Sequence, residues 1–104
     1  MSTTDRELLE LAAKAAGINL VCDGVEFMSS TNDGLRFWNP LTDDGDALRL
    51  AVRFRLLLNV DDSLSHVTDG SYIDIEELHE VTDPYAATRR AIVRAAAEIG
   101  RGMP

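Results

Sequence analysis

Four aspartates near the middle of the chain come closest to a pattern that could do chemistry. They are Asp33, Asp43, Asp44 and Asp46. Calcium and magnesium bind where several carboxylate and carbonyl oxygens converge, so this set could hold a divalent cation. The spacing does not match an EF-hand loop, in which acidic positions alternate before a glycine and a distant glutamate follows. A small metal-dependent enzyme or ligand-binding protein is therefore kept as an alternative interpretation.

The last three of these aspartates have a simpler interpretation. They directly precede an apolar stripe at helical spacing that starts at Ala47 and ends near Phe54. Aspartates at the start of a helix accept hydrogen bonds from unpaired backbone N–H groups and suit the positive end of the helix dipole. We expect these residues to cap a helix, and we predict no metal site and no cofactor.

Histidine and cysteine do not form a recognisable metal-binding pattern. His66 and His79 are thirteen residues apart, and Cys22, the only cysteine, is remote from both. A zinc site needs three or four ligands at suitable spacing, and a lone cysteine cannot form an internal disulfide. A zinc site is therefore not expected.

Serine, histidine and aspartate also occur close together, as Asp62, Ser63, Ser65 and His66. Residues so near in sequence point in different directions, and no glycines of a nucleophile elbow surround either serine. The chain also lacks a glycine-rich phosphate-binding loop. We predict no catalytic residue and expect that the protein is not an enzyme.

Negative charge is concentrated in one part of the sequence. The net charge is −8, and residues 56–88 contain eight acids and neither Lys nor Arg. Phosphate contacts require cations, and the field of an acidic protein repels a polyanion. Direct binding of nucleic acid is therefore not expected.

The same acidic segment is the candidate partner-binding surface. The candidate residues are Asp61, Asp62, Asp69, Tyr72, Asp74, Glu76, Glu77 and Glu80. An acidic surface complements a basic protein partner. The alternative interpretation is a solvated face that only aids solubility.

Length and composition indicate one domain that spans residues 1–104. The chain has the size of a single domain, and 45% of its residues are hydrophobic. No apolar run approaches the roughly 20 residues of a membrane helix, and the first residues do not resemble a signal peptide. We expect no membrane association and a cytoplasmic location.

The first half of the sequence predicts a helix and three short strands. Thr4 and Glu7 have capping-box spacing, and apolar residues at helical intervals predict a helix over residues 5–16 that ends at Gly17. Two apolar runs, residues 19–22 and 25–28, flank an Asp-Gly pair and predict a hairpin. Residues 29–34 read as a polar loop, and residues 35–38 as a third strand.

The second half predicts two more strands around a polar connection. Residues 56–60 read as a buried strand, residues 61–70 as the connection, and residues 71–76 as a strand with alternating polarity. In this last strand Ile73 and Ile75 are expected to face the core. Tyr72, Asp74 and Glu76 would then face outward.

A third helix is predicted from Pro84 to Gly100, because Asp83 is suited to cap it and proline suits its first turn. Its inward face would carry Thr88, Ile92, Ala96 and Ile99. Its opposite face would carry a basic stripe of Arg90, Arg94 and Arg101. This stripe could pair with the acids of a second copy, so a homodimer is possible. Trp38 is expected in the core.

Assembled, these elements predict an α+β domain in which three helices pack on one four- to five-stranded, mainly antiparallel sheet. Two stretches carry a resemblance to a known family. They are FWNPLTDDGDALRLAV at residues 37–52 and DPYAATRRAIVRAAAEIG at residues 83–100. Both resemble the small phage and prophage proteins of the phage ABA-sandwich domain family. The resemblance implies an α/β/α sandwich of bacteriophage origin over nearly the whole chain, with no activity, cofactor or catalytic residue to carry over.

The expected function is that of a non-enzymatic protein-binding module encoded by a phage or prophage, acting in the cytoplasm of a bacterial host. Its partner would be a host protein, for example a basic nucleic-acid-binding one. An inhibitor of a host defence system, such as an anti-CRISPR protein, is the most specific version of this expectation and rests on analogy. A minor structural protein of the virion is a further alternative.

Overall fold

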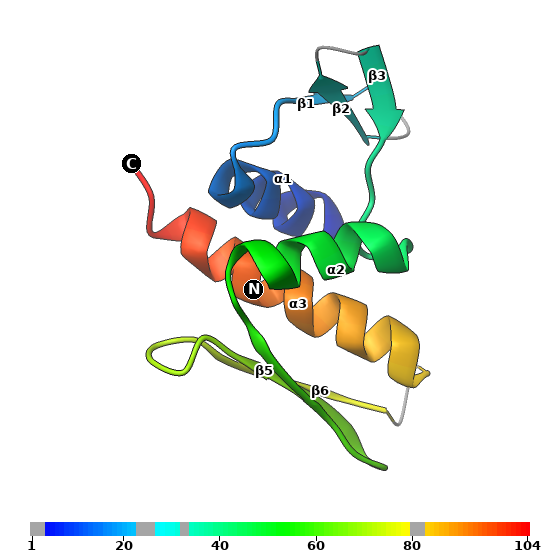
Figure 1. Ribbon diagram of the computed structural model, residues 1–104, viewed down its shortest axis with the longest axis vertical. Helices are drawn as coiled ribbons and strands as arrows, with labels where there is room; N and C mark the ends of the chain where they lie inside the picture. Colours follow the sequence, from blue (N-terminus) through cyan, green and yellow to red (C-terminus); the bar gives the residue numbers. More distant parts are fainter. Residues whose placement is uncertain (1–3, 23–26, 32–33, 80–82) are drawn as a thin grey trace.

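The longest helix, α3 (Pro84–Arg101), runs through the middle of the protein, and the other elements pack around it (Figure 1). The computed structural model describes residues 4–22, 27–31, 34–79 and 83–104. Before α3 the elements in chain order are α1 (Asp5–Ala16), β1 (Leu20–Cys22), β2 (Phe27–Thr31), β3 (Gly34–Phe37), α2 (Asp44–Arg53), β4 (Leu57–Val60), β5 (Leu64–Thr68) and β6 (Asp74–Leu78).

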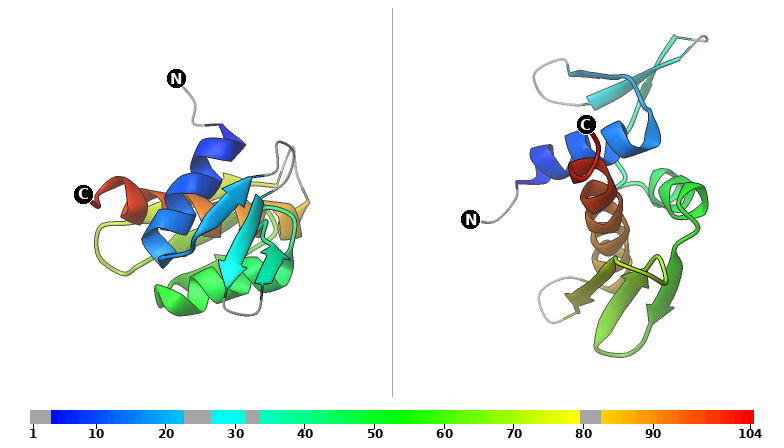
Figure 2. Two further views of the ribbon diagram at one scale, coloured as in Figure 1. Left: turned by 90° about the horizontal axis from the view of Figure 1, so that it is seen from above. Right: turned by 90° about the vertical axis from the view of Figure 1, so that its left-hand side faces the viewer.

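The described strands form two separate three-stranded antiparallel sheets, ordered β1-β2-β3 and β4-β5-β6. The helices lie between these two sheets, so the layers are sheet, helices, sheet (Figures 1 and 2). The α+β class, the three helices and the antiparallel pairing are confirmed. The finer expectations, one sheet of four to five strands and an α/β/α sandwich, are not confirmed, because the described strands form two sheets with the helices between them (Figure 1).

α1 and α3 begin at the residues that the sequence predicts, α2 begins at Asp44 within the acidic run that was expected to cap it, and each helix has a side-chain cap. Thr4 accepts a hydrogen bond from the Glu7 backbone N–H at 3.1 Å, and Asp43 accepts one from the Asp46 N–H at 2.8 Å. Asp83 accepts one from Ala86 in the same way. These caps satisfy N–H groups that have no partner inside the helix.

Small residues make α3 the centre of the core. Its alanines at positions 87, 91, 95, 96 and 97 are buried, and α1 packs closely against its second half. At Gly100 a Cβ atom would lie 2.1 Å from the backbone oxygen of Leu11, so only glycine allows this approach. The prediction of one inward face is therefore incomplete: helices and a sheet surround α3, and Val93 and Ala97 are buried as well.

The first sheet matches the sequence prediction in part. β1 and β3 lie where strands were expected, and β2 continues to Thr31 through residues that were expected to form a polar loop. The polar residues Ser29 and Ser30 pair with Arg36 and Leu35 of β3, so backbone pairing decides the structure here. The Asp23-Gly24 pair lies outside the described residues.

The second sheet differs more from the prediction. The expected polar connection contains β5, which is the central strand of the sheet. β4 was expected to be buried, but it lies at the sheet edge and all four of its residues are exposed. β6 begins at Asp74, because residues 71–73 belong to the turn that Asp69 closes.

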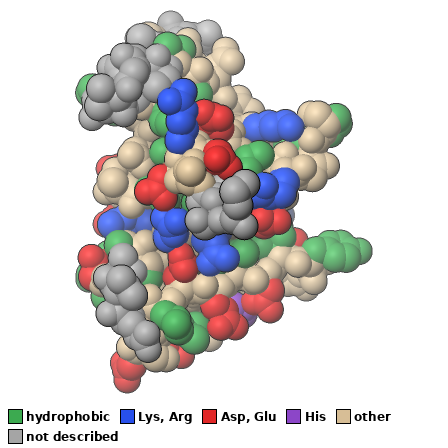
Figure 3. All heavy atoms as spheres, turned by 180° about the vertical axis from the view of Figure 1, so that it is seen from behind, with side chains coloured by type: hydrophobic (Ala, Val, Ile, Leu, Met, Phe, Trp, Pro, Cys, Tyr) green, Lys and Arg blue, Asp and Glu red, His purple; other side chains and the backbone are tan. Residues whose placement is uncertain are grey.

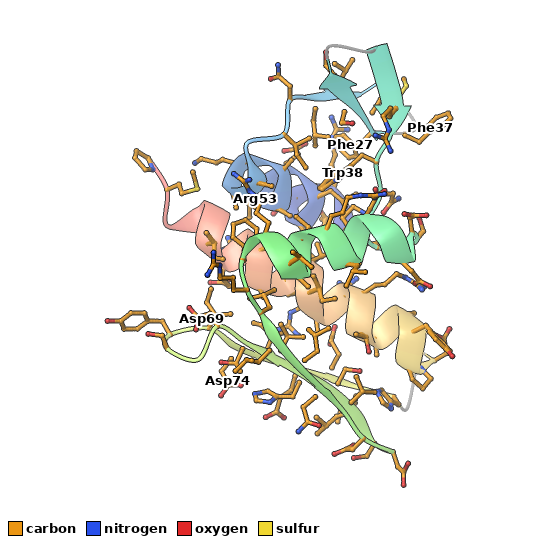
Figure 4. All side chains as sticks on the ribbon, in the orientation of Figure 1. Phe27, Phe37, Trp38, Arg53, Asp69 and Asp74 are labelled. Atoms are coloured by element: carbon orange, nitrogen blue, oxygen red, sulfur yellow. The ribbon has the colours of Figure 1, made fainter. Side chains whose placement is uncertain are left out.

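Side chains at the end of the first sheet connect it to the helices. Trp38 is buried, as predicted, and Phe27 and Leu20 pack against the same core. Figure 4 shows Trp38 directed from the end of β3 toward the helices. None of the described helices is both long enough and apolar enough to cross a membrane.

Candidate functional site

The β4–β5–β6 sheet has two faces of different character. On β5, Ser65 and Val67 are buried against α3, whereas the alternate residues Leu64, His66 and Thr68 are only half-buried. Side chains alternate between the two sides of a strand, so this pattern assigns the odd-numbered pair to an inner face and the other three to an outer face. Figure 2 shows α3 on one side of this sheet only.

The register extends this assignment to the neighbouring strands. Residues directly opposite in an antiparallel pair share a face. Leu57 and Asn59 of β4 lie opposite Thr68 and His66. Asp74, Glu76 and Leu78 of β6 lie opposite Thr68, His66 and Leu64. We call the resulting set the outer face: Leu57, Asn59, Leu64, His66, Thr68, Asp74, Glu76 and Leu78.

The outer face combines exposed leucines with acids. Leu57 is 62% exposed and Leu78 is 53% exposed, and no described helix covers them. Between these leucines, Asp74 contacts the Nε2 atom of His66, and Glu76 lies across the strand from the same histidine. Figure 3 shows acidic side chains on either side of a histidine in the lower part of the molecule. Apolar anchors within a charged surface are typical of sites that bind other proteins.

Two of the predicted site residues, Asp61 and Asp69, have a structural role in the turns that flank β5. Asp61 accepts hydrogen bonds from the backbone of Ser63 and Leu64, which lowers the pKa of its carboxyl group. Asp69 accepts hydrogen bonds from the backbone of Ile73 and Ser71, which lowers its pKa in the same way. The two carboxylates therefore stabilise the β4–β5 and β5–β6 turns.

The remaining predicted residues differ in position. Asp62 is exposed in the β4–β5 turn, and Tyr72 is 96% exposed in the β5–β6 turn, so both border the outer face. Glu80 lies outside the described residues. Glu77 is on the inner face and its side chain is only 20% exposed, so it does not belong to the outer face.

Glu77 is turned inward because two arginines of α3 hold it. Its carboxylate lies 3.1 Å from Arg90 Nε and 3.2 Å from Arg94 Nη1. Arg90 also contacts Asp5 of α1 at 2.8 Å. The prediction of a free basic stripe on α3 is therefore wrong: the arginines join α3 to β6 and α1, and Arg101 pairs with Glu98.

One serine and one histidine come together in a way that the sequence did not suggest. The Ser65 hydroxyl lies 2.9 Å from His79 Nε2 and 2.7 Å from the Thr88 hydroxyl. Ser65 is completely buried, and the Nδ1 atom of His79 is buried without a described partner. A catalytic serine must be able to reach its substrate, and its histidine must be oriented by a third group. The buried Ser65 and the described surroundings of His79 do not meet these conditions. We interpret the hydrogen bonds of Ser65 as stabilising the contact between β5 and α3.

The described aspartates before α2 also have structural partners. Asp43 caps the helix, and Asp46 accepts a hydrogen bond from the Asn39 N–H and pairs with Arg49. Asp44 pairs with Arg89 of α3 at 2.7 Å. Among the residues that the structure describes, no group of three His, Cys, Asp or Glu could hold a metal ion. The capping interpretation of Asp43 is confirmed, and Asp33 lies outside the described residues.

An apolar groove lies on the inner side of the edge strand β4, between this strand and the helices α2 and α3. Its volume is about 580 Å³. Leu58 and Val60 of β4 line one side of the groove. Leu48 of α2 and Tyr85 and Ile92 of α3 line the rest. An exposed sheet edge above an apolar groove is a surface that other chains can use for docking.

Sequence reasoning missed the leucines of the outer face and the whole of β5. The alternation in residues 64–68 and the β-branched Val67 and Thr68 carry a strand signal. Turn-forming residues lie on both sides of this strand, namely Asp61, Asp62 and the Asp69-Gly70 pair. For this reason residues 61–70 were interpreted as one loop.

Comparison with models of known protein families, with curated proteins and with solved structures finds no match.

Proposed function

We propose that this chain is a non-enzymatic protein-binding module, encoded by a phage or prophage, that uses its outer face to bind a basic protein of the bacterial host. The resemblance to the phage ABA-sandwich family supports the phage origin. Inhibition of a host defence system, as by an anti-CRISPR protein, is the most specific form of the proposal. The place of action would be the host cytoplasm.

The observation that carries this proposal is the composition of the outer face. Leu57 and Leu78 lie at opposite edges of the sheet, with Asp74 and Glu76 on the same surface. Leucine is costly to leave exposed, and burial of apolar area contributes about 25 cal/mol per Å². The acids add long-range attraction to a positively charged partner.

Charge also favours a protein over a nucleic acid as the partner. The net charge is −8, and all four arginines of α3 already pair with acids of the same chain. The outer face itself carries no Lys or Arg. A polyanion would meet repulsion there, whereas a basic protein would meet attraction.

A capture experiment tests the proposal. The protein is immobilised, exposed to bacterial lysate, and the retained proteins are identified by mass spectrometry. The test variant reverses two charges of the outer face, Asp74→Lys and Glu76→Lys. The control variant reverses two exposed charges on the helices, Glu10→Lys and Glu98→Lys, and so changes the net charge by the same amount.

We expect a basic protein that the wild type and the control retain and that the test variant loses. Equal retention by all three proteins would contradict a role for the outer face. Retention that both variants lose would show a dependence on net charge alone, which also contradicts the proposal.

A further inference from the structure

A second concave site lies at the other end of the molecule, between the β1–β3 sheet and the helices. It is a cleft of about 470 Å³, a size suited to a small molecule. Its walls come from the end of α1, from β2 and β3, and from the side of α2 that faces this sheet. The residues that matter for its chemistry are Asn19, Ser29, Arg36, Trp38, Arg49 and Arg53, together with the carboxylate of Asp46, which pairs with Arg49.

Three arginines from two different elements line this cleft. Arg49 and Arg53 lie one turn apart on α2, and Arg36 comes from β3. Arg53 extends over the end of α1, where a Cβ atom at Gly17 would lie 3.9 Å from its Nη2 atom. Figure 4 shows Arg53 and Trp38 on the side of α2 that faces the β1–β3 sheet.

Two of these arginines lack the partners that other arginines of this chain have. Arg49 pairs with Asp46 at 3.0 Å. Within the described part of the chain, neither Arg36 nor Arg53 has a carboxylate partner. The chain has eighteen acids for ten basic residues, so unpaired arginines that meet in one cleft are not explained by a shortage of acids.

Structural roles explain this arrangement only in part. The carboxyl end of α1 carries partial negative charge, which favours a cation such as Arg53 beside it. Among the described residues Arg36 has no ion pair, and its partner across the strand pair is the neutral Ser29. Several cations in one cleft repel one another, and a bound anion would relieve this repulsion.

The rest of the cleft suits a molecule with both a charged and an apolar part. Trp38 and Leu50 are buried at its base, and Ser29 and Asn19 supply polar groups at its walls. Guanidinium groups bind phosphate oxygens in bidentate fashion, and they match this planar geometry better than lysine does.

We propose that this cleft binds a small phosphate-bearing molecule, with Arg36 and Arg53 holding the phosphate oxygens and Arg49 completing the charged wall. The apolar base under Trp38 would accept the non-polar part of the ligand. The site is separate from the outer face, because the helices lie between the two sheets (Figure 2).

Isothermal titration calorimetry with inorganic pyrophosphate, with ADP and with succinate tests this assignment. Trp38 is the only tryptophan, so its fluorescence gives a second readout from inside the cleft. We expect saturable binding of pyrophosphate or ADP with a change in Trp38 fluorescence, and weaker binding of succinate. Tighter binding of ADP than of pyrophosphate would show that the apolar base contributes.

Variants distinguish the cleft from general attraction to positive charge. The test variant is Arg36→Gln with Arg53→Gln. The control is Arg55→Gln, which removes an arginine that lies outside the cleft and also lacks a described carboxylate partner. We expect at least about a tenfold loss of affinity in the test variant and less than about a twofold change in the control.

Three outcomes would overturn the proposal. The first is the absence of saturable binding of either phosphate probe to the wild type. The second is succinate binding as tight as that of pyrophosphate. The third is an equal loss of affinity in the test and control variants, with circular dichroism showing that both are folded.

Discussion

The two faces of the β4–β5–β6 sheet carry neighbouring residues with opposite roles. On the inner face, Val67 and Ile75 pack on α3, and Glu77 holds two arginines of that helix. On the outer face, Leu57 and Glu76 extend into solvent. The inner face attaches the sheet to the core, whereas the outer-face side chains at these positions are exposed.

Glu76 and Glu77 show this difference most clearly. They are adjacent and chemically identical, but Glu77 accepts two ion pairs from α3. The Glu76 side chain has no ion pair with a described residue, and only its backbone oxygen accepts a hydrogen bond from Arg94. Because strand residues alternate in direction, a one-residue shift changes a glutamate from a structural group into a surface group.

The largest expected effect is the loss of a buried side chain from the inner face. Val67→Ala should lower the free energy of unfolding by about 2 kcal/mol, because Val67 is 0% exposed and the change leaves a cavity. Leu57→Ala on the outer face should change it by less than about 0.5 kcal/mol. Urea unfolding followed by circular dichroism measures both. Equal losses would contradict the distinction between the two faces.

A smaller effect is expected for the two glutamates. Glu77→Gln should lower the free energy of unfolding by about 1 kcal/mol, because two partly buried arginines lose a charged partner. The matched variant Glu76→Gln should leave stability within about 0.3 kcal/mol of the wild type. The same urea titration compares them. A larger loss in Glu76→Gln than in Glu77→Gln would show that the face assignment is wrong.

The smallest expected effect is on the acid dependence of stability and concerns the turns between the strands. Backbone hydrogen bonds hold the pKa of Asp61 and Asp69 below the ordinary value of 3.8. Each group therefore adds stability at pH values above 3.8, and this contribution is lost as the pH falls through the lowered pKa.

Asp69→Asn should accordingly reduce the loss of stability between about pH 5 and about pH 3 relative to the wild type. Asp62→Asn is the control, because Asp62 lies in the β4–β5 turn, which Asp61 rather than Asp62 closes. Thermal unfolding at a series of pH values gives the comparison. Identical acid dependence in Asp69→Asn and the wild type would show that the hydrogen bonds of Asp69 do not cause the acid dependence of stability.

The helices could be predicted from the sequence because their signals are local. Thr4, Asp43 and Asp83 cap the first turns, and Gly17 ends α1 in the left-handed conformation with φ of 70°. These residues act on backbone groups within four positions of themselves. The burial of Trp38 was also predicted correctly.

The sheets could be predicted only in part because strand pairing is not local. Nothing near Leu57 in the sequence indicates that β4 lies at a sheet edge, and β5 was hidden between two turn signals. The arginines of α3 were expected in solvent because helical spacing does not show that β6 places Glu77 beside Arg90 and Arg94. The sequence therefore predicted the candidate site only as an acidic segment. The structure was needed to identify its leucines and to show which side chains share the outer face.

The most direct test of the central claim is a rate measurement on the double variant Asp74→Lys, Glu76→Lys. Its association with the basic host protein retained in the capture experiment is followed over a series of salt concentrations, and circular dichroism checks its fold. We predict an intact fold, association at least about tenfold slower than for the wild type at low salt, and a much weaker dependence on salt. Unchanged association with an intact fold would contradict the claim and leave the acids of the outer face as a solvated surface.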